Sequence, residues 1–355
     1  MKSLRALGLL TLLLVVGCGD KATNEEPAGD GGSGTPAKTS GKATGDGEQP
    51  TIAFVTNGIA SFWDIADKGA KDGGKEFGAV VKVIMPPKGV ADQKRMVEEV
   101  LAGKIDGVAI SPIDPDNQGD LMDEIAKRTK LITHDSDAPK SKRLCYIGMD
   151  NYTAGRMCGQ LVKKAMPKGG TVMIFVGRLS QANARLRRQG VIDELMDRSQ
   201  DAKRYDEPSK GEIKGKTYTI LDTRTDEFDR VRAKSQAQDA IAKYPNLGCM
   251  IGLFAYNPPL LLAAAKEAGK LGKIKVVAFD EADETLKGIQ DGHCFGTIVQ
   301  NPYKYGYESV KMLAALARGD NKVIPKGAYM DIPARTITKA NVVKFWDELK
   351  KLTKK

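Results

Sequence analysis

The chain has 355 residues, which is enough for two ordinary domains. Its 55 basic and 45 acidic residues give a formal net charge of +10, but the basic residues are spread along the chain and form no dense block. This distribution is typical of a solvated surface and argues against a nucleic-acid partner, although it allows a mild attraction to an anionic membrane.

The first 17 residues predict an export signal. Lys2 and Arg5 give a basic start, and residues 7–16 form an apolar run that is too short to span a bilayer. The run ends in Val-Val-Gly-Cys at residues 15–18, which resembles the bacterial lipobox. The resemblance implies that Cys18 becomes the lipidated first residue of the mature protein. The alternative is an ordinary signal peptide in which Cys18 has no such role.

Residues 20–50 predict a flexible linker. They contain no aromatic residue and no Leu, Ile or Val, so they cannot bury enough apolar area to fold. We therefore expect a signal peptide at 1–17, a lipidated N-terminus and linker at 18–50, and a folded body from residue 51. Such a protein would be exported and held at the cell envelope by its lipid, either in the periplasm or on the outer face of the membrane.

The stretch TIAFVTNGIASFW at residues 51–63 sets the pattern for the body. Residues 52–55 predict a short buried strand, Asn57 and Gly58 break it, and a helical pattern begins near Phe62. Phe62 and Trp63 therefore lie where a strand ends and a helix begins, which is the ligand-binding edge of an open parallel sheet. Core packing is the alternative for one of them. We do not expect both to face inward, because adjacent helical positions point about 100° apart.

Apolar strands and amphipathic helices then alternate with short connections. In the first half we expect strands at 80–85, 107–110, 130–133 and 144–148, and helices at 63–77, from the cap Asp92 to 101, and at 121–126. In the second half we expect strands at 171–176, 216–222, 249–253, 275–279 and 294–299, and helices at 151–161, 183–196, 228–244, 258–268 and 282–290. A last helix at 305–318 is expected to cross back to the first half.

This alternation predicts an α/β protein with two doubly wound, Rossmann-like lobes of parallel sheet joined by a hinge. We expect residues 51–150 with 301–330 to form the N-terminal lobe, and residues 151–300 with 331–355 to form the C-terminal lobe.

The sequence offers little for catalysis, a metal or a cofactor. The spacing of Cys145, Cys158, Cys249 and Cys294 matches no metal motif and does not reveal any pairing; Cys249 and Cys294 lie in apolar runs, where buried free thiols are the default. A partial calcium-loop pattern near residue 114 lacks its final carboxylate. There are two His residues, and HExxH, GxSxG and Walker patterns are absent. We therefore expect no enzyme activity, no metal and no cofactor.

Polar and aromatic residues recur where the expected strands end or helices begin. Each has an ordinary structural explanation as a cap, turn or core residue, but their shared location at strand ends predicts one binding site. Aromatic rings pack on the C–H faces of a sugar, and charged groups exchange hydrogen bonds of about 1.5–3 kcal/mol with hydroxyls. The candidate ligand-binding residues are Asn57, Phe62, Trp63, Asp135, Asn183, Arg187, Phe228, Asn257, Asp280 and Gln300.

From residue 51 to 333 the chain resembles the ribose/galactose-type (type I) periplasmic binding proteins, the soluble receptors of sugar ABC importers. The stretches that carry the resemblance are IAFVTNGIASFW, DGVAISP, LITHDSDAP, YIGMDNYTAG, NARLRRQG, EFDRVRA, YNPP, VVAFDE and GTIVQNP. The resemblance implies that eight of the candidates contact the ligand: Phe62, Trp63, Asp135, Arg187, Phe228, Asn257, Asp280 and Gln300.

Two positions depart from the ribose receptor's pattern. Ala60 stands where the pattern has an Asn, and Ser136 stands where it has an Arg. Asn57 stands in for the first by position only. The second change removes a bidentate donor, which argues against ribose itself and leaves pentitols, hexoses and other polyols as candidates.

We therefore expect a monomeric receptor that binds a monosaccharide or a related polyol and delivers it to an ABC importer permease. One alternative is a sensor that presents the ligand to a membrane chemoreceptor or kinase. Another is a carbohydrate-active enzyme that uses Asp135 and Asp280 as an acid/base pair, but the sequence shows no nucleophile for it. A transcription regulator is disfavoured, because an export signal occupies the place of an N-terminal helix-turn-helix.

Overall fold

The computed structural model describes residues 48–208 and 211–353. The predicted signal peptide, Cys18 and most of the predicted linker lie outside the described residues. Every helix in the described ranges is too short or too polar to cross a bilayer.

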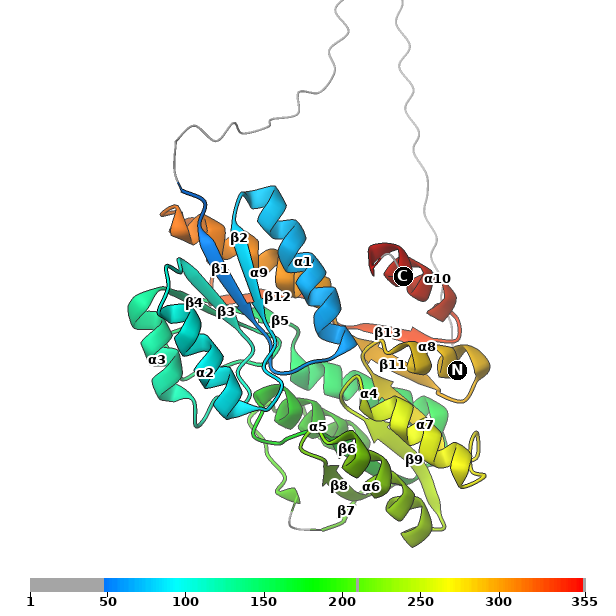
Figure 1. Cartoon of the computed structure of the whole chain (residues 1–355). Coiled ribbons are helices and arrows are strands. Elements are labelled where there is room, and N and C mark those ends of the chain that lie inside the picture. Colours follow the sequence, from blue (N-terminus) through cyan, green and yellow to red (C-terminus); the bar gives the residue numbers. More distant parts are fainter. Residues whose placement is uncertain (1–47, 209–210, 354–355) are drawn as a thin grey trace, which may run out of the picture. The chain divides into compact units, whose positions relative to one another are not determined.

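The first sheet is parallel throughout and has helices on both faces (Figure 1). Its strands, in the order β12-β5-β4-β3-β1-β2, are β12 (Tyr329–Asp331), β5 (Tyr146–Gly148), β4 (Lys130–His134), β3 (Gly107–Ile110), β1 (Thr51–Val55) and β2 (Val80–Ile84). Helices α1 (Ser61–Phe77) and α9 (Pro302–Ala317) cover one face, and α2 (Val90–Leu101) and α3 (Gly119–Arg128) cover the other. Because both faces are covered, the strands are nearly continuous apolar runs.

Strand β1 shows how this burial works. Ile52 and Phe54 pack toward α1 and α9, whereas Ala53 and Val55 pack toward α2 and α3. All four side chains are fully buried. Successive side chains of a strand point to opposite faces, so the residues of one apolar run pack into two hydrophobic cores.

Helix α9 returns the chain to the first sheet and lies directly against α1. A methyl group on Gly69 would sit 2.0 Å from the carbonyl oxygen of Tyr303, and one on Gly306 would sit 2.1 Å from that of Ala66. The two helices therefore touch through their backbones, which glycine alone permits.

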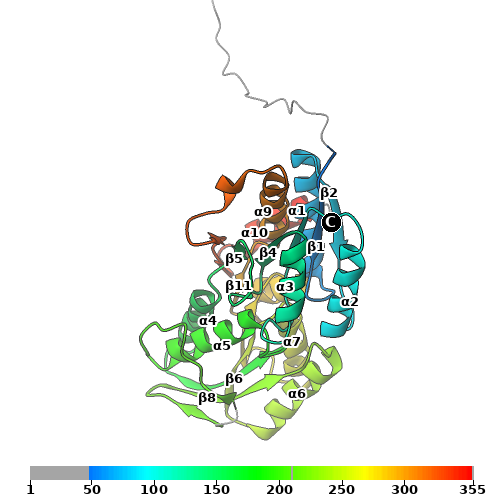
Figure 2. The same cartoon turned by 90° about the vertical axis from the view of Figure 1, so that its left-hand side faces the viewer.

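The second sheet, which contains β6, β8 and β11 of Figure 2, is parallel in its centre and antiparallel at both edges. Its strands, in the order β13-β11-β10-β9-β6-β8-β7, are β13 (Arg335–Thr338), β11 (Gly296–Val299), β10 (Lys275–Phe279), β9 (Leu247–Gly252), β6 (Gly170–Val176), β8 (Tyr218–Thr225) and β7 (Ile213–Lys214). Helices α4 (Asn151–Ala165) and α5 (Ala182–Leu195) cover one face; α6 (Arg230–Lys243), α7 (Asn257–Glu267), α8 (Asp283–Asp291) and α10 (Val342–Thr353) cover the other.

The chain passes between the two sheets three times. The crossings lie between β5 and α4, between β11 and α9, and between β12 and β13. Two α/β lobes are thus present, as the sequence predicts. The edge strands β7, β12 and β13 were not predicted, because such short strands carry too few residues to show a period. The helix α10 was not predicted either, although its 12 residues are amphipathic.

Two local predictions about helix starts are wrong. Asp92 is not the cap of α2 but lies in its first turn, after Gly89 at φ 84°, and its carboxylate accepts a hydrogen bond from the Lys88 amide at 3.2 Å. Phe228 does not open α6. It has φ 64°, and the following Asp229 caps the helix by accepting hydrogen bonds from two backbone amides. Cys145, Cys158, Cys249 and Cys294 are buried free thiols.

Candidate functional site

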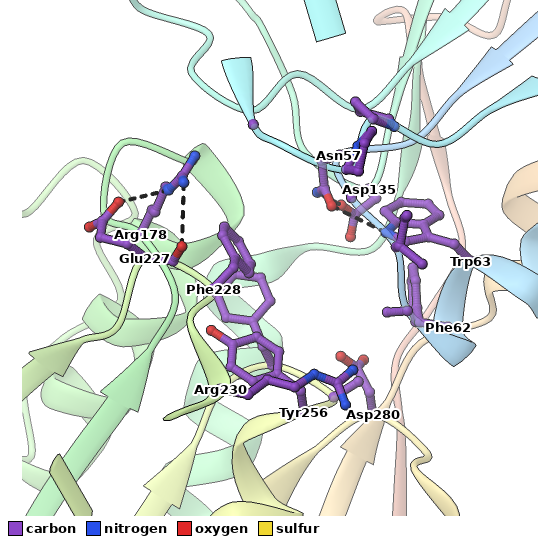
Figure 3. A pocket seen from close by; sticks show the side chains of 18 of the residues that line it. Asn57, Phe62, Trp63, Asp135, Arg178, Glu227, Phe228, Arg230, Tyr256 and Asp280 are labelled. Carbon is purple, nitrogen blue, oxygen red and sulfur yellow. Dashed lines mark hydrogen bonds and ion pairs between the residues drawn. The ribbon is translucent and has the colours of Figure 1, made fainter. Parts of the chain in front are cut away.

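A cavity of about 470 Å³ lies where the carboxyl ends of the strands of both sheets meet (Figure 3). Rings of Phe62 and Trp63 lie on one side of it, and rings of Phe228 and Tyr256 lie on the other. Eight of the ten candidate residues line it: Asn57, Phe62, Trp63, Asp135, Arg187, Phe228, Asp280 and Gln300. The structure therefore brings together side chains separated by more than two hundred positions in the sequence.

The other two candidates lie behind the cavity wall. Asn183 donates from Nδ2 to Asp135 Oδ2 at 3.2 Å, and Asn257 donates from Nδ2 to Asp226 Oδ2 at 2.9 Å. Both are buried and neither lines the cavity. Their geometry suits them to orient carboxylates: Asn183 holds Asp135, which lines the cavity, and Asn257 holds Asp226, which does not.

Asp135 follows β4 and is held by donors from both lobes. Its φ of 57° turns the chain sharply at the strand end. Oδ2 accepts hydrogen bonds from Asn57 at 3.1 Å, Ser111 at 2.9 Å and Asn183 at 3.2 Å. Burial raises the pKa of Asp135, while the nearby guanidinium of Arg187 and these three donors oppose the rise.

Arg187 projects from α5 and is completely buried. It donates from Nε to Asn151 Oδ1 at 2.9 Å and from Nη1 to the carbonyl of Leu253 at 3.1 Å, and Nη2 lies 3.6 Å from Asp135 Oδ1. Its guanidinium carbon also stands 4.4 Å from the ring centroid of Phe279. These contacts fix the guanidinium plane before any ligand arrives.

Asp280 follows β10 and resembles Asp135 in its backbone, with φ 65°. Its Oδ1 accepts a hydrogen bond from Gln300 Nε2 at 2.8 Å, and Gln300 Oε1 in turn accepts one from the hydroxyl of Tyr305 at 3.1 Å. Burial raises the pKa of Asp280 to about 6, opposed by the charge of Arg187, the Gln300 hydrogen bond and the Ala255 amide.

The aromatic pair at the start of α1 corrects one expectation. Phe62 and Trp63 are 6% and 3% exposed, so both face inward. Their rings meet edge to face with centroids 4.7 Å apart, and Trp63 Nε1 donates to Asn57 Oδ1 at 3.2 Å. Both can be buried because the first turn of α1 meets protein on two sides: Phe62 packs toward Tyr305 and Trp63 toward His134.

The opposite wall is a second aromatic cluster. The ring of Phe228 lies 5.5 Å from that of Phe254 and 5.8 Å from that of Tyr256, measured between centroids. The Tyr256 hydroxyl donates to Asp226, whose pKa burial raises to about 6. With Phe62 and Trp63 across the cavity, this arrangement can hold a flat ligand between apolar rings.

Sequence reasoning missed a rim of charged residues. Arg178 follows β6, and its Nε lies 2.7 Å from Glu227 Oε2; its guanidinium carbon is 5.2 Å from the Phe228 ring centroid. Arg230, in the first turn of α6, and Lys88 also line the cavity and are exposed. Arg178 stands at a strand end, so the rule that found Asp135 and Asp280 would have found it too.

The two departures from the ribose-type pattern lie in different places. Ala60 lines the cavity and brings no side-chain donor to it. Ser136 is buried outside the lining, and its Oγ has no hydrogen-bond partner in residues 48–208 or 211–353. Asn57 lines the cavity, but its amide already bonds Ser111, Asp135 and Trp63.

Comparison with known proteins agrees with the fold. Residues 52–321 match the model of the periplasmic binding protein domain. The D-allose-binding periplasmic protein of Escherichia coli K12 is 25% identical over 281 residues, which cover 74% of this chain and 83% of that protein. The ribose import binding protein RbsB of the same organism is 23% identical over 275 residues, which cover 76% and 86%.

Two solved structures are similar over most of the chain. GanP, a glucose-galactose binding protein from Geobacillus stearothermophilus, has a TM-score of 0.73 and 26% identity and covers 83% of this chain and 99% of its own. A solute binding protein from Burkholderia graminis in complex with D-arabinose has a TM-score of 0.74 and 26% identity and covers 84% and 98%. With its two α/β lobes and the match over residues 52–321, the chain belongs to the periplasmic binding protein domain family.

Proposed function

We propose that this chain binds a monosaccharide or a related polyol reversibly in its cavity and delivers it to the permease of an ABC importer. The observation that carries the proposal is the cavity itself, where the fixed polar groups of Asp135, Arg187, Asp280 and Gln300 lie between two aromatic walls. The similar proteins named for D-allose, ribose, glucose-galactose and D-arabinose support a sugar as the ligand.

The chemistry of the cavity supports binding without turnover. Asp135 Oδ2 accepts from three neutral donors, and Oδ1 lies 3.6 Å from Arg187 Nη2, so the carboxylate is held as an acceptor beside a cation and is poorly suited to transfer a proton. A sugar ring between the walls would exchange hydrogen bonds with Asp280, Gln300 and Arg187, and the apolar rings would exclude water. An acid/base pair of Asp135 and Asp280 is therefore disfavoured.

The two lobes would close on the ligand by bending at the three crossings between the sheets. We assign residues 51–150 and 301–330 to one lobe and residues 151–300 and 331–355 to the other. On this assignment Asp135 belongs to the first lobe, and Asn183 and Arg187 to the second, so the polar floor already bridges them.

We further propose that Cys18 anchors the protein to the membrane through a lipid. The lipobox-like residues 15–18 and the predicted linker support this. Cells that express the chain and take up radiolabelled palmitate should label the protein, and Cys18→Ala should remove the label. A labelled Cys18→Ala variant would reject the anchor and leave sugar binding untouched.

The test of the function is calorimetric titration of the purified chain with pentoses, hexoses and polyols. We expect a saturable signal with at least one of them. Asp280→Ala should weaken it at least tenfold, whereas Asp239→Ala, which removes an exposed carboxylate on α6, should not. A flat trace with every sugar and polyol would reject the proposal.

A further inference from the structure

The floor of the cavity carries more negative than positive charge. Asp135 and Asp280 are each 3% exposed, and both line it. Of the four cationic side chains in the lining, Lys88, Arg178, Arg187 and Arg230, only Arg187 is fully buried. Two buried carboxylates therefore face one buried guanidinium.

The carboxylate that lies within ion-pair distance of that guanidinium is Asp135. Its Nη2 lies 3.6 Å from Asp135 Oδ1 and makes no hydrogen bond within the described residues, while Nε bonds Asn151 and Nη1 bonds the Leu253 carbonyl. At the rim, Arg178 is paired with Glu227 at 2.7 Å. The one fully buried cation of the lining is thus ion-paired with Asp135, although its Nη2 keeps hydrogen-bond donors for a ligand.

Asp280 lacks such a partner. Gln300, a neutral amide, donates to Oδ1, and Oδ2 has no side-chain partner among the described residues. No ion pair joins Asp280 to a cation anywhere in residues 48–208 or 211–353. A buried carboxylate without a cation is costly, and a site that keeps one is suited to a ligand that supplies the positive charge.

The residue behind Asp280 does not relieve this deficit. Glu281 is 6% exposed, and neither of its carboxyl oxygens has a hydrogen-bond partner within the described ranges. Burial raises its pKa well above the ordinary value, so it adds no full charge, but it also gives Asp280 no compensation.

We infer that the ligand carries a protonated amine, as in an amino sugar or an aminated polyol, and that its ammonium group binds the carboxylate of Asp280. This rests on the proposed function and narrows its ligand class. An ammonium group has three donors, which suit Asp280 Oδ2 and the remaining lone pair of Gln300 Oε1. The rings of Phe62 and Phe228 in the same cavity favour a cation further.

One rival lies within the chain. Arg230 is exposed, lines the same cavity and makes no ion pair with a described carboxylate. If lobe closure carried Arg230 to Asp280, the protein would supply the missing charge itself. Amino sugars would then bind no better than neutral ones, so the rival predicts a different result in the same experiment.

The test is calorimetric titration of the full chain at about pH 7 with three matched sets, each of an amino sugar, its neutral hydroxyl parent and its N-acetyl derivative. The sets are built on glucosamine, galactosamine and mannosamine. We expect at least one amine to bind ten or more times tighter than both neutral relatives. Asp280→Asn, which keeps the shape and removes the charge, should abolish that preference, and Asp239→Asn should retain it.

A second measurement uses the wild-type chain, so it does not depend on folding of the variant. Near pH 6 the ammonium group should displace the proton of Asp280, so binding of the amine should release a proton to the buffer. The binding heat of the amine should therefore vary with the ionisation enthalpy of the buffer, and it should vary more than the binding heat of the neutral parent sugar does. Three results would overturn the inference and leave the proposed function standing: neutral sugars that bind as tightly as the amines, an amine preference that survives Asp280→Asn, or no extra proton release. If none of these nine sugars and none of the pentoses, hexoses and polyols bound, the proposed function would be rejected instead.

Discussion

Arg187 joins the two lobes through a single side chain, and its role depends on geometry as much as charge. Arg187→Lys keeps the charge but cannot reach Asn151, the Leu253 carbonyl and Asp135 together. We expect sugar affinity to fall at least tenfold, or about 1.4 kcal/mol, as measured by calorimetry. Arg232→Lys, on the exposed face of α6, is the matched control. Unchanged affinity in Arg187→Lys would show that the guanidinium fork is not needed.

Asp280 should make binding of a neutral sugar depend on pH. Its pKa of about 6 means that roughly a tenth of it is ionised at about pH 5 and most of it at about pH 7. The carboxylate is the better acceptor for hydroxyl donors, so affinity should rise across this window and level off above it. Titrations at several pH values should show the rise, and Asp280→Asn should flatten it. Asp226 titrates in the same range but lies outside the cavity lining. If the affinity of Asp280→Asn still rose with pH, the pH dependence would belong to a group other than Asp280.

The contribution of Asp280 to folding stability changes with pH in the opposite direction to its contribution to binding. Its pKa is higher in the folded protein than the ordinary 3.8, so the folded state binds more protons between these two values. The contribution of Asp280 to the free energy of unfolding is therefore greatest below about pH 4 and is lost as the pH rises through about 6. Over the same pH window, ionisation of Asp280 strengthens ligand binding and weakens folding stability. This opposition is typical of a carboxyl group that is buried for function.

At the scale of elements, the strand ends were the predictable part of the site. Asp135 and Asp280 follow unmistakable apolar runs, so their place at the ligand edge could be inferred before their neighbours were known. The ion pair of Arg178 with Glu227 could not, because it depends on how the loops after β6 and β8 meet. The supporting roles of Asn183 and Asn257 were equally hidden, since a strand-end amide looks the same whether it faces a ligand or a carboxylate.

Helix α1 carries Phe62 and Trp63, and its position depends on close contact with α9. Gly69→Ala would place a methyl group 2.0 Å from the Tyr303 carbonyl oxygen and force the helices apart. We expect a loss of about 1–3 kcal/mol in the free energy of unfolding, measured by urea denaturation. Weaker sugar binding should accompany it, because the aromatic wall moves with α1. Gly119→Ala, whose added methyl group meets no atom within 4 Å, should leave both quantities nearly unchanged. Equal stability of the two variants would contradict the tight packing.

At the scale of the whole molecule, the floor contacts between lobes imply that ligand and closure are coupled. Asp135 contacts Arg187 in the cavity floor and Asn183 behind it, both from α5, and Arg185 Nη2 of the same helix lies 3.2 Å from Asp116 Oδ2. The Arg185–Asp116 pair is partly solvent-exposed, so it is worth at most about 1 kcal/mol and cannot hold the lobes shut alone. A ligand that bonds Asp280 and packs on both aromatic walls adds the missing contacts.

We therefore expect saturating sugar to reduce the radius of gyration measured by X-ray scattering, because bending at the three crossings brings the two sheets together. Arg185→Ala should leave both the reduction and the affinity within severalfold of wild type. Arg187→Ala should require far more sugar for the same reduction, since it removes a floor contact shared by both lobes and leaves Asp135 unpaired. A full binding isotherm with no change in scattering would mean that the cavity accepts its ligand without closure, and the crossings would then be rigid connections and not hinges.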